Sequence, residues 1–133
     1  MKIKLNKFVS NLIPPMRMHY DDAGVDCFAQ EDFELKNDAI VNLGFGLEIP
    51  NGYVGLLLPR SSMNAKNIIT PVGTIDSGYR GELKAKFINH GDLQKFKRGE
   101  RICQIVILPI AICEFTQYLG NERGVNGFRS TGK

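Results

Sequence analysis

Short runs of apolar or alternating residues fill most of this 133-residue chain, and glycine, proline or asparagine ends many of them. Short runs bounded by turn-forming residues are typical of β-strands. Because many such runs follow one another at even spacing, the pattern predicts an all-β sandwich or barrel. No repeat or linker is visible, and the length suits one domain. We predict strands at residues 2–8, 25–29, 33–35, 39–43, 45–49, 53–58, 68–70, 82–89 and 102–112.

One predicted strand and one predicted helix stand apart from the rest. The run at 102–112 is almost continuously apolar, which predicts a central strand covered on both faces. Residues 61–66 carry the only good helix signal, since Ser61 or Ser62 can cap a short helix.

Charge and cysteine content narrow the class of protein. The 17 basic and 14 acidic residues give a net charge of +3, too mild for a nucleic-acid stripe but suited to a small polyanionic ligand. Cys27, Cys103 and Cys113 are odd in number and lie in largely apolar surroundings, so we expect reduced core residues. The apolar runs near the N-terminus are short and broken, which argues against a signal peptide or a membrane span. We therefore expect a cytoplasmic protein without a membrane or stable nucleic-acid partner.

Glycines surround an acid and an aromatic residue in the stretch at 73–83, which contains Asp76 and Tyr79. An alternating apolar segment follows, so the stretch predicts a tight β-hairpin whose tip presents side chains. Glycine lets a ligand approach the main chain, and such a tip could read a small molecule with backbone groups. An ordinary solvated turn is the alternative that this stretch leaves open by itself.

A candidate anion site lies where the strand at 53–58 ends. Arg60 precedes Ser61 and Ser62, so a guanidinium, two hydroxyls and the N–H groups of a helix start could all face one phosphate. Alternatively, Ser61 only caps the helix and Arg60 pairs with a surface carboxylate. Nearby, the acids Asp21, Asp22 and Asp26 could hold the waters of Mg²⁺, although such acids also form turns.

Most hydrolytic machinery is missing from the sequence. His19 and His90 are isolated, and no Ser/His/Asp constellation or Walker loop is present. A carboxylate that positions water remains. Asp76 could orient and deprotonate a water in line with a phosphorus atom, while Mg²⁺ and arginines disperse the charge of the phosphates.

The composition changes from Gly120 onward to Gly, Arg, Asn, Ser and Thr. Composition alone favours a frayed basic tail. The functional alternative is a mobile arm that orders over an anionic ligand, in which Arg123 and Arg129 supply fork-shaped donors and Phe128 a stacking face.

Five segments carry these groups: Ala-Gly-Val-Asp at 23–26, Pro-Arg-Ser-Ser-Met at 59–63, the stretch at 73–83, Gly-Glu-Arg-Ile-Cys-Gln at 99–104 and Arg-Gly-Val-Asn-Gly-Phe-Arg-Ser-Thr-Gly at 123–132. In this order and spacing they resemble the motifs of the trimeric deoxyuridine triphosphatases (dUTPases). The resemblance implies a jelly-roll β domain at 1–119 with one short helix, and a mobile arm at 120–133 that closes over an active site. It also implies a homotrimer with shared active sites.

The implied reaction is Mg²⁺-assisted hydrolysis of dUTP to dUMP and pyrophosphate, which lowers dUTP and supplies dUMP for thymidylate synthesis. In the family's pattern the stretch at 73–83 admits uracil, with Gly73 and Ile75 among the binding residues. Tyr79 would lie beneath the deoxyribose and exclude a 2′-hydroxyl, and Asp76 would activate the water that attacks the α-phosphorus.

The resemblance also assigns the groups around the phosphates. Asp26 would bind the hydration shell of Mg²⁺, and Phe128 from a neighbouring subunit would stack on uracil. The triphosphate would be held by Arg60, Ser61, Ser62 and Gln104, and its γ-phosphate by Arg123, Ser130 and Thr131.

Three positions depart from the family's pattern. Gly78 stands where a second Asp is common, and we expect little loss because Asp76 and Tyr79 remain. In the tail, Asn126 replaces a common Gly. Arg129 replaces another, and its side chain could clash or add a contact to the γ-phosphate.

Two other functions fit a related chain. One is a dUTPase-fold protein that binds nucleotide and acts as a regulatory module, and the other is a dCTP deaminase of the same fold. The retained motifs argue for catalysis, and the hairpin together with the Phe-containing tail favours uracil and hydrolysis.

Overall fold

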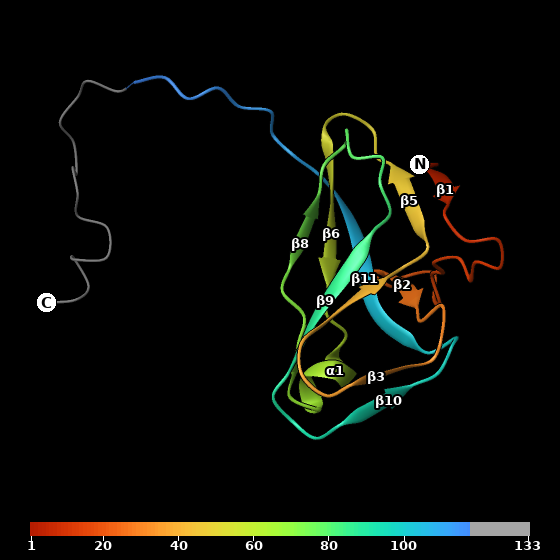
Figure 1. The fold of residues 1–133 in the computed structure, drawn as a ribbon. Coiled ribbons are helices and arrows are strands. Elements are labelled where there is room, and N and C mark those ends of the chain that lie inside the picture. Colours follow the sequence, from red (N-terminus) through yellow and green to blue (C-terminus); the bar gives the residue numbers. More distant parts are fainter. Residues whose placement is uncertain (118–133) are drawn as a thin grey trace, which may run out of the picture.

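The computed structural model describes residues 1–117 as a β-fold with one short helix, as the sequence predicts (Figure 1). The predicted arm at 120–133 lies outside the described residues, and with it Arg123, Asn126, Phe128, Arg129, Ser130 and Thr131. The elements are β1 Lys4–Lys7, β2 Val25–Phe28, β3 Phe33–Leu35, β4 Ala39–Asn42, β5 Phe45–Glu48, β6 Tyr53–Leu58, α1 Ser61–Ala65, β7 Ile68–Ile69, β8 Gly73–Ile75, β9 Lys84–Asn89, β10 Gln94–Phe96 and β11 Arg101–Pro109.

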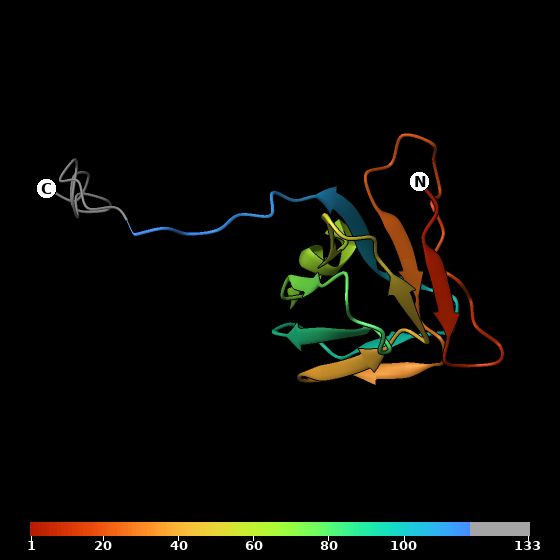
Figure 2. The same ribbon diagram turned by 90° about the horizontal axis from the view of Figure 1, so that it is seen from above.

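The strands form antiparallel sheets whose neighbours are mostly distant in sequence. One sheet has the order β2-β11-β6-β8 and another has the order β4-β9-β7, while β1 pairs with β5 and β3 with β10. Figure 2 shows the strands in two layers. This arrangement, with sheet neighbours that cross between distant parts of the chain, is that of a jelly roll.

The core lies between the layers and is built by residues from many strands. Phe45 of β5 and Phe87 of β9 are no more than 1% exposed, and full burial of such a side chain contributes about 1.5–3 kcal/mol. The central strand β11 adds Ile102, Cys103 and Ile105 to this core. Strand β11 is thus central, as predicted, but it ends at Pro109 and only its first half is well buried.

The predicted hairpin at 73–83 is wrong as a paired structure. Strand β8 pairs with β6, β9 pairs with β4 and β7, and no ladder joins β8 to β9 within residues 1–117. The cause is competition from the β4–β5 turn: the Leu83 N–H donates to the Phe45 oxygen, and the Leu43 N–H donates to the Leu83 oxygen. The chain therefore leaves β8 in one sheet and enters β9 in another.

Smaller predictions were also corrected. Cys27 and Cys103 are buried, but Cys113 is exposed because it follows the end of β11. Neither Ser61 nor Ser62 caps α1: Arg60 is the N-cap residue and makes no capping side-chain bond, and the helix is held by the buried Met63. Strand β10 carries no clear sequence signal and was not predicted. No helix within residues 1–117 is long and apolar enough to cross a membrane.

Candidate active site

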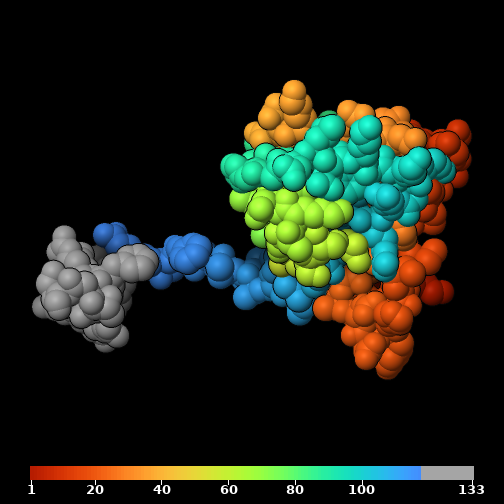
Figure 3. Space-filling view, turned by 90° about the horizontal axis from the view of Figure 1, so that it is seen from below, coloured from red at the N-terminus to blue at the C-terminus, as the bar shows by residue number. Residues whose placement is uncertain are grey.

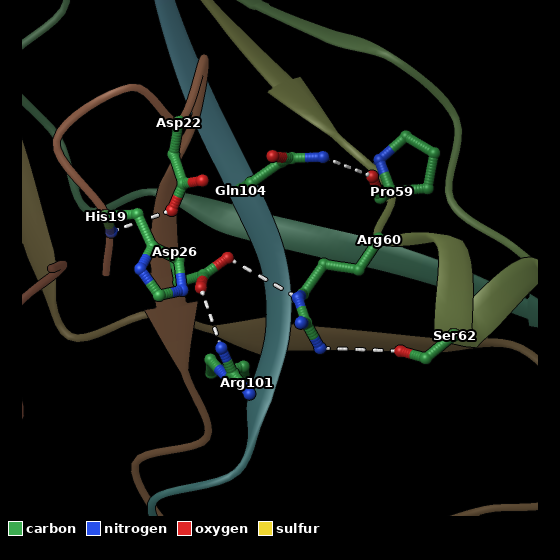
Figure 4. Close-up of polar contacts among 8 residues, drawn as sticks. All are labelled: His19, Asp22, Asp26, Pro59, Arg60, Ser62, Arg101 and Gln104. Carbon is green, nitrogen blue, oxygen red and sulfur yellow. Dashed lines mark hydrogen bonds and ion pairs between the residues drawn. The ribbon is translucent and has the colours of Figure 1, made fainter. Parts of the chain in front are cut away.

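Strand β11 brings three distant parts of the sequence to one place. In the register of the sheet, Gln104 lies opposite Asp26 of β2 on one side and opposite Leu58 of β6 on the other. Because Pro59 and Arg60 directly follow Leu58, their polar groups lie beside the same point of β11 (Figure 4). Segments separated by tens of residues thus converge through the strand order alone.

Asp26 is the centre of this polar cluster. Its Oδ1 lies 3.4 Å from Arg60 Nε, and its Oδ2 lies 3.4 Å from Arg101 Nη1. Arg60 Nη1 also donates to the Ser62 hydroxyl at 3.4 Å, and Gln104 Nε2 donates to the Pro59 carbonyl oxygen at 2.9 Å (Figure 4). The Asp26 side chain is 14% exposed, so its carboxylate is mostly shielded from solvent and held by both guanidiniums.

The charge of this cluster suits an anion. Two guanidiniums face one carboxylate, and a hollow of about 380 Å³ beside them is lined by three basic residues, Arg60, Lys66 and Arg101, and by one acid, Glu100, among others. Lys66 extends over the ring of Phe96, with Nζ 5.4 Å from the ring centroid. Arginine forks of this kind bind phosphate oxygens readily. Ser61 is exposed at the start of α1.

At this point residues 1–117 supply too few side chains to hold a metal ion by themselves. Residues 1–117 contain no group of three or more His, Cys, Asp or Glu side chains that could hold a metal ion. Asp22 accepts the backbone N–H of His19 at 2.9 Å and is a turn-forming residue, while Asp21 is exposed. Of these three acids, Asp26 is the one that lies in the arginine cluster. Mg²⁺ at phosphate sites usually keeps several waters and takes phosphate oxygens as ligands, so a single nearby carboxylate is compatible with it.

A second candidate region lies between β8 and β9. A cavity of about 250 Å³ is lined from both sides, by Leu57, Gly73, Thr74, Ile75, Asp76, Tyr79, Glu82, Leu83 and Lys84. Strand β8 is the end strand of its sheet, and β7 pairs with β9 only at Ile88 and Asn89. Along the edges that β6 and β4 do not use, backbone N–H and C=O groups at Gly73–Ile75 and at the start of β9 are therefore without a strand partner among residues 1–117, and a ligand could use them. A planar molecule with donors and acceptors on one edge could take the place of the missing ladder.

Asp76 and Tyr79 stand at the end of this cavity. The Tyr79 N–H donates to the backbone carbonyl oxygen of Asp76 at 3.1 Å, which closes a tight turn. The side chains of both residues are exposed. The Tyr79 hydroxyl donates to the Glu82 carbonyl oxygen at 3.0 Å. The turn thus presents both an acid and an aromatic ring to solvent at the cavity.

The two regions are separate within one protomer. Ile75 pairs with Gly55, so Asp76 lies level with Val54 of β6. Arg60 follows the end of β6 and is six residues after Val54 in the sequence. At about 3.3 Å per residue, this places Asp76 and Arg60 on the order of 20 Å apart along the sheet. The structure therefore brings Asp26, Arg60, Ser62 and Gln104 together, and separately Gly73, Ile75, Asp76 and Tyr79.

Sequence reasoning singled out neither Arg101 nor Glu82 as a site residue. Arg101 stands three residues before Gln104 on β11 and binds the same carboxylate that Arg60 binds. Glu82 lies one residue before the end of the 73–83 stretch and lines the cavity, as Tyr79 does. Both residues lie inside the segments that resemble dUTPase motifs, at 99–104 and 73–83, and that location was the signal that could have identified them as site residues.

Comparison with known proteins gives one consistent family. The family model described as dUTPase matches residues 11–132. A deoxyuridine 5′-triphosphate nucleotidohydrolase of Clostridium tetani is 39% identical over 142 residues, covering 100% of this chain and 97% of the relative. One from Gloeothece citriformis is 38% identical over 141 residues, covering 99% and 97%.

Solved structures agree with these relatives. A mutant dUTPase from phage phi11 of S. aureus, described for its coordination of a structural Mg(II) ion, has a TM-score of 0.85 at 26% identity and covers 92% of this chain and 99% of that one. A mutant dUTPase of Staphylococcus bacteriophage 80alpha with dUpNHpp has a TM-score of 0.84 at 28% identity, covering 91% and 98%. With a family model that spans nearly the whole sequence and relatives matched end to end, this chain belongs to the dUTPase family.

Proposed function

We propose that this chain is a dUTP diphosphatase that hydrolyses dUTP to dUMP and pyrophosphate, lowering dUTP and supplying dUMP for thymidylate synthesis. The observation that carries the proposal is the cavity between β8 and β9, whose facing edges form no ladder and whose open end holds Asp76 and Tyr79. Family membership and relatives named for the same nucleotide support it.

The cavity supplies the base and sugar subsites. Backbone groups around Gly73 and Ile75 would pair with the edge of uracil, and a cavity of about 250 Å³ is small enough to select against a larger base. Tyr79 would lie against the deoxyribose. A 2′-hydroxyl would then meet the ring without a hydrogen-bond partner, which disfavours ribonucleotides.

The Asp26 cluster supplies the phosphate subsite. Arg60, Ser61, Ser62 and Gln104 would hold the triphosphate, with the guanidinium of Arg60 and the hydroxyl of Ser62 already in contact. Mg²⁺ would enter with the nucleotide, where it would neutralise phosphate charge, and Asp26 would hold its hydration shell. A carboxylate that two arginines already orient needs little rearrangement for that role.

Asp76 is the proposed catalytic base. Its carboxylate is exposed at the open end of the cavity, where it can accept a proton from a water molecule and align that water with the α-phosphorus. Because water is the nucleophile, the protein itself would form no covalent bond with the substrate, and the pyrophosphate would leave while bound to cationic groups.

We further propose that the active site forms between the subunits of a homotrimer. Asp76 and Arg60 lie too far apart in one protomer to contact adjacent parts of one nucleotide, so the base subsite of one chain would meet the phosphate subsite of another. Residues 110–117 follow the end of β11 and lead away from the body after Ile110, whose N–H donates to the Gly52 carbonyl oxygen at 2.8 Å (Figure 3). They expose Ile112 and Phe115 at 81% and 93%, as expected of a segment covered by a partner.

The arm at 120–133 completes the proposed site. Phe128 would stack on the base, and Arg123, Arg129, Ser130 and Thr131 would contact the terminal phosphate. Closure would exclude water other than the nucleophile. An arm supplied by another subunit agrees with residues 110–117, which lead away from their own body (Figure 1).

A substrate panel tests the proposed function. The protein is incubated with Mg²⁺ and dUTP, dCTP, dTTP or UTP, and pyrophosphate release is measured. We expect release from dUTP alone at a substantial rate. Equal release from dCTP or UTP would refute the specificity, and binding of dUTP without release from any nucleotide would instead indicate a regulatory binding protein.

A further inference from the structure

We propose that Glu82 is a positioning residue that fixes the ring of Tyr79 and so sets how strictly the site refuses a ribonucleotide. This inference rests on the proposed function, in which Tyr79 lies against the sugar. Glu82 itself contacts neither the sugar nor the phosphates in this proposal, and it acts through the tyrosine.

Tyr79 has little packing to hold it in place. Its side chain is 45% exposed, so no core surrounds the ring. Two hydrogen bonds define its position instead. The Tyr79 N–H donates to the backbone carbonyl oxygen of Asp76 at 3.1 Å, and the Tyr79 hydroxyl donates to the backbone carbonyl oxygen of Glu82 at 3.0 Å. The far end of the ring therefore follows the backbone of Glu82.

The backbone of Glu82 is in turn anchored by its own side chain. Its Oε2 accepts the N–H of Gly44 at 2.9 Å, in the turn between β4 and β5. Gly44 has a φ of +83°, a backbone conformation that would be strained for a residue with a side chain. The charged acceptor makes this a stronger bond than a neutral pair. The next residue, Leu83, is bonded on both sides to the same turn.

Two glycines show how closely these pieces fit. A Cβ at Gly81 would overlap the hydroxyl and Cζ of Tyr79, so the ring lies directly over the Gly81 backbone. A Cβ at Gly46 of β5 would lie 2.5 Å from the Gly81 carbonyl oxygen. The stretch from Tyr79 to Glu82 is therefore seated on β5 and on the β4–β5 turn, and the ring has one supported position.

Loss of the Glu82 carboxylate should release this support. Without the bond to Gly44, the Glu82–Leu83 peptide keeps the bond from the Leu83 N–H to the Phe45 oxygen but loses its second anchor. The Glu82 carbonyl can then tilt about the remaining bond and carry the Tyr79 hydroxyl with it. A displaced ring would leave room for a 2′-hydroxyl, so discrimination between dUTP and UTP would fall more than the rate with dUTP. A role in folding alone would lower stability without changing that ratio.

The test compares kcat/KM for dUTP and for UTP in several variants. In Glu82→Ala we expect the dUTP/UTP ratio to fall about tenfold, because a loosened ring gives up part of the steric discrimination against the 2′-hydroxyl. Glu82→Gln should keep the ratio, since its amide oxygen can still accept the Gly44 N–H. Glu48→Ala is the matched control: it removes a β5 carboxylate that accepts a 3.1 Å bond from Asn6, away from Tyr79, and should keep the ratio.

Two further variants make the test independent of the folding of Glu82→Ala. Tyr79→Phe removes only the hydroxyl, and Gly46→Ala pushes on the Gly81 carbonyl; each should lower the ratio severalfold. A dUTP/UTP ratio within about twofold of wild type in folded Glu82→Ala overturns the inference. If Glu82→Ala does not fold, the same result in both Tyr79→Phe and Gly46→Ala overturns it. Wild-type release from dUTP is measured first: with an active wild type an unchanged ratio refutes this inference alone, whereas an inactive wild type refutes the proposed function and this inference with it.

Discussion

Asp26 of β2 and Arg60, the residue before α1, form an ion pair in which Oδ1 and Nε lie 3.4 Å apart. The second carboxylate oxygen is occupied by Arg101. The sequence left open whether Arg60 binds phosphate or pairs with a carboxylate. The ion pair makes the two roles compatible, because its carboxylate is that of Asp26, the acid proposed to bind the hydration shell of Mg²⁺. Binding of a metal–nucleotide complex would then exchange contacts within one preformed cluster.

Replacement of Asp26 should separate metal binding from nucleotide binding. In Asp26→Asn we expect the Mg²⁺ concentration for half-maximal activity to rise about tenfold or more, since a neutral amide holds metal-bound water weakly. Binding of dUTP without Mg²⁺ should not weaken, because two arginines lose their competing carboxylate. Titration of activity with Mg²⁺ is the measurement. Asp22→Asn is the control, and an unaltered Mg²⁺ requirement in Asp26→Asn would contradict the assignment.

Asp76→Asn should lose catalysis while retaining substrate. The amide keeps the shape of the side chain but cannot take a proton, and loss of a general base typically costs about 10²–10⁴ in rate. Single-turnover rates and the dUTP dissociation constant, measured by calorimetry, distinguish the two effects. Asp38→Asn changes another exposed acid and should have neither effect. A parallel loss of affinity would mean that Asp76 is structural.

Gly24→Ala tests the placement of Gln104. A Cβ at Gly24 would overlap the Gln104 amide oxygen, so this side chain must move and give up its 2.9 Å bond to the Pro59 oxygen. We expect KM for dUTP to rise severalfold, with a smaller change in kcat. Gly78→Ala is the comparison, because its Cβ would meet no atom within 4 Å. An unchanged KM in Gly24→Ala would show that Gln104 does not help to bind the triphosphate.

Removal of residues 120–133 should leave the β-fold intact and impair catalysis. Every buried side chain of residues 1–117 lies at or before Ile105, so the core does not depend on the end of the chain. We expect the melting temperature to stay within a few degrees and kcat/KM for dUTP to fall about 10²-fold, as for loss of substrate positioning. Full activity in the shortened protein would refute the proposed arm.

The three cysteines should differ in reactivity. A hydrogen bond that the Cys27 thiol donates to Cys103, together with burial, raises the pKa of the Cys27 thiol, which keeps it protonated and unreactive. Cys113 is exposed. A thiol-specific chromogenic reagent at mildly alkaline pH should therefore modify one cysteine in the native protein and three in denaturant. Rapid modification of Cys27 before unfolding would contradict the buried β2–β11 pairing.

The sequence predicted most strands because alternation and turn residues are local properties. The ranges at 33–35 and 53–58 agree with β3 and β6, and the buried residues of β11 follow from its apolar run. Strand β10 was missed because Gln94–Phe96 is short and mostly polar, and it forms only because β3 provides a partner. The exposed position of Cys113 was missed because an apolar run does not show where its strand leaves the core.

Candidate groups for the site were also readable from the sequence, since the motifs name the residue types that phosphate, water and a nucleobase require. Tertiary structure alone decided how they are arranged. Asp76 and Arg60 are only 16 positions apart in sequence, yet the antiparallel register of β6 and β8 places them at opposite ends of a sheet. Periodicity determines which face of a strand is buried, whereas its neighbours are chosen by the packing of the whole chain. For that reason residues 73–83 pass from one sheet to another and line an open cavity, and they do not form a paired hairpin.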